Sequence, residues 1–237
     1  MHTTDYDKLY PGLGATITSM ATQGVNPDLA THLNDFLAEP GKASGRAAAK
    51  KKAPVVISAD ALLGDKKYKR PNGDDYYTRK WGEHDDVEVL RKARGKSQFI
   101  LLYGAPGCGK TAVVEAAFGE NLQTVLGSGD TEVSDLVGGY IQTPSGGFVW
   151  EDGPLLKAAE SGSVLLIDEI GLIDPKVLSI VYGLMDGRRE YTVTANPERG
   201  TVKADDGFYV IAATNPNAPG VRISEALLSR FTIHVEM

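Results

Sequence analysis

A glycine-rich segment in the middle of the chain has the residue types and spacing of a phosphate-binding loop. Residues 104–111 (GAPGCGKT) fit the pattern G-x-x-x-x-G-K-[ST] at every fixed position. The apolar run 98–103 before it predicts a buried strand, and residues 111–118 after it predict a helix that Gly119 ends. These elements together predict an anion site, because backbone N–H groups and the positive end of the helix dipole face one volume.

Each residue type in this loop has a chemical purpose. Glycines let the backbone wrap phosphate oxygens without side-chain clashes. Lys110 brings a mobile positive charge to the β- and γ-phosphates, and Thr111 offers a hydroxyl to Mg²⁺. The residues expected to bind nucleotide are Gly104, Ala105, Pro106, Gly107, Cys108, Gly109, Lys110, Thr111, Ala112 and Asp168. The alternative, a chance glycine-rich turn, is disfavoured by the flanking strand and helix.

A second segment adds acids to this site. Residues 163–170 (SVLLIDEI) form an unbroken apolar run that ends in two carboxylates, as expected of a buried parallel strand. Ligand sites in such sheets lie beyond the carboxyl ends of the strands. Asp168 is therefore expected to hold Mg²⁺, and Glu169 to orient and polarise the attacking water. A solvated acidic turn is the alternative, and the phosphate loop makes ATP hydrolysis the better interpretation.

The composition excludes several classes of protein. The 237 residues are 42% hydrophobic with a net charge of −6, which disfavours nonspecific coating of nucleic acid. A single cysteine allows no internal disulfide and fits a reducing compartment. No apolar run approaches the ~18 residues of a membrane span, and the N-terminus lacks a signal-peptide core. A cytoplasmic protein without a membrane partner is expected.

Changes in composition along the sequence divide the chain into four parts. A short N-terminal helical segment (1–39) and a basic flexible linker (40–54) come first. The linker could instead be a tether that touches nucleic acid. A lead-in segment (55–96) is expected to pack on the core (97–237). Its aromatic residues form either a packing patch, which is favoured, or a wall beside adenine.

From residue 98 onward, strands alternate with helices, which predicts an α/β fold with a five-stranded parallel sheet between helical layers. The expected strands are 98–103, 122–126, 163–170, 207–214 and 231–235. The other expected elements are helices over 85–94, 111–118, 152–161 and 174–185, and a hairpin of 190–194 with 200–203.

Residues 72–237 resemble the MoxR-like, dynein-related group of AAA+ ATPases, which includes the cobalt chelatase and gas-vesicle ATPases. The resemblance rests, in order, on 104–111, 163–170, 213–216 (ATNP) and 224–231 (SEALLSRF). Residues 135–155 between the first two are similar to the helix-2 insertion of that group.

The resemblance implies further site residues. Asn215 resembles the sensor that holds the attacking water, although an Asn before a proline also forms turns. Arg230 resembles an arginine finger that acts in a neighbouring subunit, although an arginine ending a helix also complements its dipole. Arg222 is a second candidate for such a contact.

The resemblance also implies an assembly and partners. These are a ring, expected to have six subunits as in the family, and a client protein, in some relatives one with a von Willebrand A-type domain. Residues 141–151 and 190–203 would face the client, with Phe148, Val149 and Trp150 either exposed or packed under the loop. The family's helical lid is not expected, because the sequence stops at Met237 just after the fifth strand. A fragment of a longer protein is the favoured explanation.

Three other functions stay open: a nucleotide-controlled binding switch with little hydrolysis, a DNA-acting motor supported only by Lys50–Lys52, and, least favoured, a phosphotransferase. Cys108 is expected to be a tolerated small residue, with a redox switch as the alternative.

Overall fold

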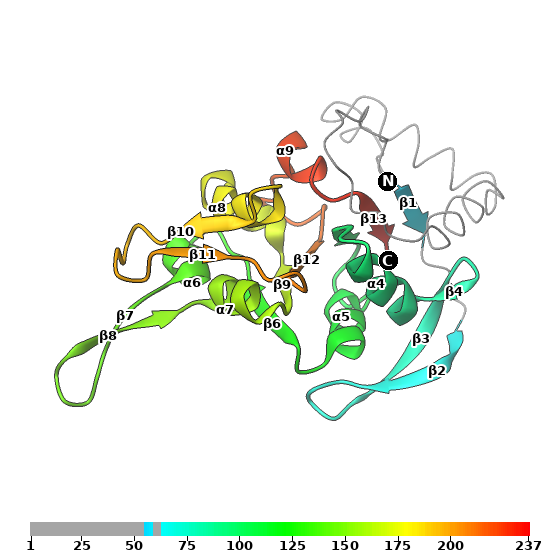
Figure 1. Cartoon of the computed structure of the whole chain (residues 1–237). Coiled ribbons are helices and arrows are strands. Elements are labelled where there is room, and N and C mark those ends of the chain that lie inside the picture. Colours follow the sequence, from blue (N-terminus) through cyan, green and yellow to red (C-terminus); the bar gives the residue numbers. More distant parts are fainter. Residues whose placement is uncertain (1–54, 59–62) are drawn as a thin grey trace. The chain divides into compact units, whose positions relative to one another are not determined.

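The computed structural model describes residues 55–58 and 63–237 (Figure 1). The expected N-terminal helical segment 1–39 and basic linker 40–54 lie outside these residues. The strands are β1 (Val55–Ser58), β2 (Leu63–Lys69), β3 (Asp75–Trp81), β4 (His84–Asp85), β5 (Ile100–Tyr103), β6 (Leu122–Leu126), β7 (Gly138–Gln142), β8 (Phe148–Asp152), β9 (Val164–Asp168), β10 (Glu190–Thr192), β11 (Thr201–Lys203), β12 (Tyr209–Thr214) and β13 (Ile233–Glu236). The helices are α4 (Asp86–Gly95), α5 (Lys110–Phe118), α6 (Val133–Val137), α7 (Pro154–Ser161), the 3₁₀ turn η1 (Ile170–Leu172), α8 (Pro175–Met185) and α9 (Glu225–Leu228).

The central sheet is parallel throughout, in the order β1-β13-β5-β12-β9-β6. The five strands expected from the sequence are confirmed, and β12 lies between β5 and β9, with Ile211 opposite both Ile100 and Leu166. A sixth strand, β1, pairs with β13 at one edge, where Val55 lies opposite Ile233. The sequence had assigned this run only to the lead-in segment, because four residues are too few to show a pattern.

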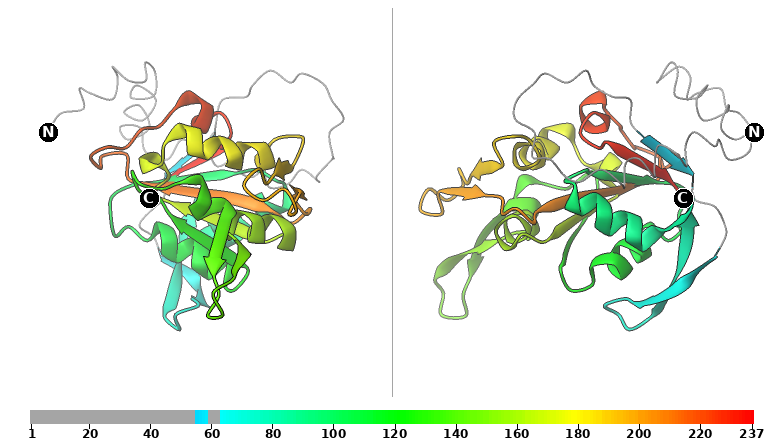
Figure 2. Two further views of the ribbon diagram at one scale, coloured as in Figure 1. Left: turned by 90° about the vertical axis from the view of Figure 1, so that its left-hand side faces the viewer. Right: turned by 45° about the vertical axis from the view of Figure 1, so that its right-hand side comes forward.

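Alternation along the strands assigns their side chains to two layers of core. Leu101 of β5 and Leu165 of β9 belong to a buried cluster that includes residues of α6, α7, α8 and α9. Buried residues of α4 and α5, such as Leu90 and Val114, are not part of that cluster. The latter two helices pack against each other and are seen side by side in Figure 2.

Local sequence signals set the helix ends. Gly119 ends α5 with a φ of 56°, a conformation that suits glycine. Asp174 caps α8, where its side chain accepts a hydrogen bond from the Lys176 backbone at 2.8 Å. The α7 helix begins at Pro154 rather than at the expected residue 152. Asp152 instead ends β8, paired with Gly138.

Two antiparallel hairpins depart from the sheet. The hairpin of β7 and β8 lies between α6 and α7, at the place of the expected insertion, and extends away from the sheet (Figure 1). Phe148 and Val149 are exposed, by 68% and 47%, whereas Trp150 is partly buried and packs edge-to-face on Tyr140 at 5.3 Å. The expected hairpin of β10 and β11 is confirmed, with Tyr191 opposite Val202.

The lead-in segment forms a three-stranded sheet, β2-β3-β4, followed directly by α4. Tyr76 and Trp81 of β3 are buried, as a packing patch requires, while Tyr77 is exposed. Within residues 55–58 and 63–237, no helix is both long and apolar enough to cross a membrane.

Candidate functional site

The loop between β5 and α5 contains three glycines in backbone conformations that other residues rarely adopt. Gly104, Gly107 and Gly109 have φ angles of 156°, 78° and 91°, in the region that favours glycine. Lys110 is the first residue of α5 and is buried, and its Nζ donates to the carbonyl oxygens of Gly104 and Ala105 at 3.0 and 3.1 Å. The ammonium group therefore lies within the loop, where a bound anion would meet it.

Thr111 and Asp168 come together across two elements. Thr111 Oγ1 donates to Asp168 Oδ2 at 2.6 Å, which joins the first turn of α5 to the carboxyl end of β9. The Asp168 backbone is fixed from the other side, because its carbonyl oxygen accepts from the Gly127 N–H at 2.8 Å. The expected proximity of the acidic strand to the phosphate loop is present in the structure.

The Glu169 carboxylate lies at the edge of the sheet, close to the end of β12. Its backbone is left-handed, with φ 50° and ψ 41°, which is uncommon for residues other than glycine. Glu169 Oε2 accepts from the Asn215 N–H at 3.1 Å, and Asn215 directly follows β12. Asn215 Oδ1 accepts from the Asn217 N–H at 3.2 Å, so this side chain also forms the local turn that its sequence context allowed.

Arg230 lies two residues beyond α9, slightly later than expected. Ser224 caps that helix as expected, with its hydroxyl accepting from the Leu227 N–H at 3.2 Å. Arg230 Nη1 donates to the Ala226 carbonyl oxygen at 2.7 Å, and the guanidinium lies 4.1 Å from the centre of the Tyr182 ring. Arg222 is exposed, and its backbone N–H binds the Gly171 carbonyl. Neither arginine contacts Lys110 or Glu169 within the described part of the chain.

Cys108 lies next to the amine of the loop lysine. Its sulfur accepts from Lys110 Nζ at 3.7 Å, and the residue is partly exposed. This contact is compatible with both interpretations of the cysteine.

Arg79 of β3 also lies against the loop, which no sequence motif indicates. A Cβ atom placed on Gly109 would lie 2.4 Å from Arg79 Nη2. The two residues are 30 positions apart, and no motif relates them. Only the placement of the β2-β3-β4 sheet brings them together.

The donor groups suit a magnesium–nucleotide complex. Mg²⁺ prefers oxygen ligands and usually takes one or two from the protein, with water and phosphate oxygens completing its shell. The Thr111 hydroxyl and the Asp168 carboxylate form such a pair. The glycine loop and the buried Lys110 amine suit the phosphates themselves.

Residues 99–231, more than half of the chain, match the model of the AAA domain of the dynein-related subfamily. The chain belongs to this family. The matched range contains the phosphate loop, Asp168, Glu169, Asn215 and Arg230, and it carries an AAA-type ATPase domain.

This AAA domain is similar in sequence to proteins of two bacteria. An uncharacterized protein of Staphylococcus haemolyticus is 41% identical over 143 residues, which cover 56% of this chain and 53% of the relative. Protein NorQ of Paracoccus denitrificans is 34% identical over 135 residues, which cover 56% of this chain and 49% of NorQ. The chain thus spans about half the length of these relatives. The similarity to NorQ identifies it as a MoxR-like AAA+ ATPase.

The fold comparison agrees. A solved structure from Cytophaga hutchinsonii, of a protein described provisionally as an ATPase, superimposes with a TM-score of 0.51 at 26% identity. The match covers 64% of this chain and 44% of that one.

Proposed function

We propose that this AAA+ ATPase hydrolyses ATP in a Mg²⁺-dependent reaction, as a subunit of a ring that remodels a partner protein in the cytoplasm. One observation carries the proposal. The 2.6 Å hydrogen bond from Thr111 to Asp168 joins the phosphate loop to the acidic strand, next to Glu169. The residues proposed to bind Mg²⁺ and the proposed general base, Glu169, therefore lie at the same edge of the sheet.

The residues have separate roles in this proposal. Lys110 and the loop N–H groups bind the phosphates, and Thr111 and Asp168 hold Mg²⁺. When bound, Mg²⁺ supplies positive charge that neutralises the phosphate oxygens. Glu169 orients the attacking water and accepts its proton, and Asn215 positions that carboxylate through its backbone N–H.

Arg230 would complete the site of a neighbouring subunit. Arg230 is partly buried just beyond α9, and its guanidinium contacts the Ala226 carbonyl oxygen and the Tyr182 ring. Such a finger stabilises charge that develops on the transferring phosphoryl group and is worth about 10³–10⁵ in rate in related NTPases. In this scheme the ring, expected to have six subunits, holds one nucleotide at each interface.

The β7–β8 hairpin offers a surface for the client. Tyr140, Ile141, Phe148 and Val149 are exposed by 47–68%, which gathers apolar area on one projecting element. Exposed apolar patches of this kind usually bind protein. A client with a von Willebrand A-type domain is the partner that the family resemblance favours.

A Glu169→Gln substitution tests hydrolysis directly. The amide keeps the shape of the side chain but cannot accept a proton, so we expect ATP turnover to fall by at least about 100-fold. The affinity for ATP should stay within a few-fold of wild type, because the phosphate contacts are untouched. Turnover is measured as phosphate release, and ATP affinity by calorimetry.

The matched control is Glu120→Gln, which makes the same change at an exposed residue after α5. It should leave both quantities unchanged. If E169Q and wild type hydrolyse ATP equally slowly, the nucleotide-controlled switch is the better function. Salt-sensitive DNA binding that disappears on removal of residues 40–54 would instead support a DNA-acting motor.

A further inference from the structure

The phosphate loop is in contact with an arginine from outside the AAA match. A Cβ atom on Gly109 would lie 2.4 Å from Arg79 Nη2 and 3.5 Å from its Cζ. A real Cβ atom essentially never has a neighbour this close, so a side chain at position 109 would collide with Arg79. Glycine leaves room for the guanidinium beside the Gly109 backbone. The φ angle of 91° at Gly109 is a second, separate reason for glycine at this position.

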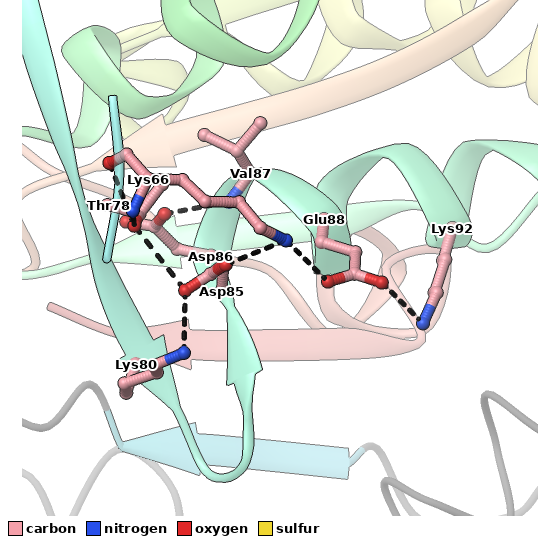
Figure 3. A network of polar contacts seen from close by, with 8 residues as sticks. All are labelled: Lys66, Thr78, Lys80, Asp85, Asp86, Val87, Glu88 and Lys92. Carbon is pink, nitrogen blue, oxygen red and sulfur yellow. Dashed lines mark hydrogen bonds and ion pairs between the residues drawn. The ribbon is translucent and has the colours of Figure 1, made fainter. Parts of the chain in front are cut away.

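The neighbours of Arg79 on β3 are fixed to a buried acid on the opposite face. Side chains alternate along a strand, so Thr78 and Lys80 point one way and Arg79 the other. Lys80 Nζ binds Asp85 Oδ1 at 2.9 Å, and Thr78 Oγ1 donates to the same oxygen at 3.4 Å (Figure 3). Asp85 is only 4% exposed, so these contacts fix the strand on both sides of Arg79.

The network continues into α4. Lys66 Nζ lies 3.1 Å from Asp85 Oδ2 and 3.6 Å from Glu88 Oε2, and Glu88 in turn binds Lys92 at 2.9 Å (Figure 3). Burial would raise the pKa of Asp85, but its hydrogen bonds with Lys80 and Lys66 outweigh this and hold the pKa below its ordinary value. The acid therefore stays ionised and keeps the small sheet attached to α4.

The two buried acids that follow β3, Asp85 and Asp86, have partners on several residues. Asp85 is held by two lysines, and Asp86 accepts from the Tyr76 hydroxyl and the Val87 N–H. Burial raises the pKa of Asp86, and nearby Arg79 has a smaller lowering effect on it through its backbone N–H and its charge. A guanidinium has five N–H donors, and here they border the loop that is proposed to hold phosphate.

We propose that Arg79 binds the phosphate chain of the nucleotide in its own subunit. The inference rests on the proposed function and adds a residue to it. Lys110 brings positive charge from within the loop, and Arg79 brings it from the β2-β3-β4 sheet. A planar guanidinium suits phosphate oxygens because it can donate two parallel hydrogen bonds. Nucleotide binding would then join the lead-in sheet to the phosphate loop.

The test is nucleotide binding by Arg79→Gln and Arg79→Lys, measured by calorimetry with ADP and with adenosine in the presence of Mg²⁺. Loss of a charged hydrogen bond predicts about tenfold weaker ADP binding by R79Q. Adenosine, which has no phosphate, should bind as it does to wild type. R79K should lose less, because it keeps the charge but not the planar fork.

The control is Arg188→Gln, which removes the same charge from a side chain that is 77% exposed and paired with Asp186. It should bind ADP as wild type does. R79Q with wild-type ADP affinity would overturn the inference and leave the proposed function intact, as would R79Q that loses ADP and adenosine equally. Wild-type protein that binds no nucleotide would overturn both. Thermal unfolding of each variant confirms that it is folded.

Discussion

Glu169 adopts a backbone conformation that few side chains other than glycine, asparagine and aspartate tolerate. Conformations of this kind cost about 1–3 kcal/mol and persist where surrounding contacts enforce them. Here the contacts are the Asn215 N–H on the Glu169 carboxylate and the Gly127 backbone, where a Cβ atom would lie 2.7 Å from the Glu169 carbonyl oxygen. The strain directs the carboxylate from the end of β9 toward β12.

His234 of β13 should make the protein sensitive to acid. The side chain is 4% exposed, and burial holds its pKa below the ordinary value. Because the folded state disfavours the proton, the neutral form stabilises it fully above the unfolded pKa of about 6.5, and this stability is lost as the pH falls below that value. Urea unfolding at several pH values should show the loss.

A His234→Gln variant, which cannot gain the proton, should lose much of that slope between pH 6.5 and 5. His84→Gln, at a partly buried position in β4, is the control and should keep it. Equal slopes in wild type and H234Q would show that other groups cause the acid sensitivity.

Residues within one continuous motif could be placed from the sequence, and residues that meet only through packing could not. Lys110 and Thr111 follow the loop directly, and Asp168 was placed correctly because parallel strands end at a common edge. Arg79 was missed because its contact with Gly109 depends on how a separate small sheet packs. Sequence spacing carries no information about that packing.

At the scale of the elements, Arg199 connects the loop between β10 and β11 to β8 and α7. Arg199, in the loop between β10 and β11, binds Asp152 with Nε at 3.1 Å and with Nη2 at 2.8 Å. The same Nη2 lies 2.5 Å from Glu160 of α7. The hydrogen bonds from Arg199 lower the pKa of Asp152, so the pair stays ionised. The loop of the β10–β11 hairpin is thereby connected to the base of the β7–β8 hairpin.

Arg199→Met should destabilise the protein by about 1–3 kcal/mol, because it leaves the partly buried Asp152 without its charged hydrogen bonds. Urea unfolding measures the loss. Arg188→Met removes an exposed arginine and should change stability by less than about 0.5 kcal/mol. Equal effects of the two substitutions would mean that the Arg199 contacts add no stability.

The sequence predicts the β10–β11 hairpin and, through the family resemblance, an insertion at the place of β7 and β8, but it does not predict the start of α7. Proline at the first helical turn marks Pro154 well, yet the helix predicted from the sequence also includes residues 152 and 153. Asp152 instead pairs with Gly138 in β8 and binds Arg199. The strand pairing of Asp152 and its contact with Arg199 therefore determine where α7 begins.

At the scale of the whole molecule, the apolar runs predicted five parallel strands, and the structure adds β1 at the edge. Long runs such as that of β9 are recognisable because both faces of a central parallel strand are buried. β1 has only four residues, and it is recognisable as a strand only because it pairs with β13.

The trans action proposed for Arg230 predicts complementation between inactive subunits. Lys110→Ala removes a phosphate contact but keeps Arg230, whereas Arg230→Ala keeps the phosphate loop. If the finger acts across an interface, an R230A subunit beside a K110A subunit has one complete site. An equal mixture, combined before ATP is added, should then hydrolyse ATP at about a quarter of the wild-type rate, because about a quarter of randomly formed interfaces are complete. Each variant alone should be nearly inactive. A mixture no more active than its components would place Arg230 outside the neighbouring site.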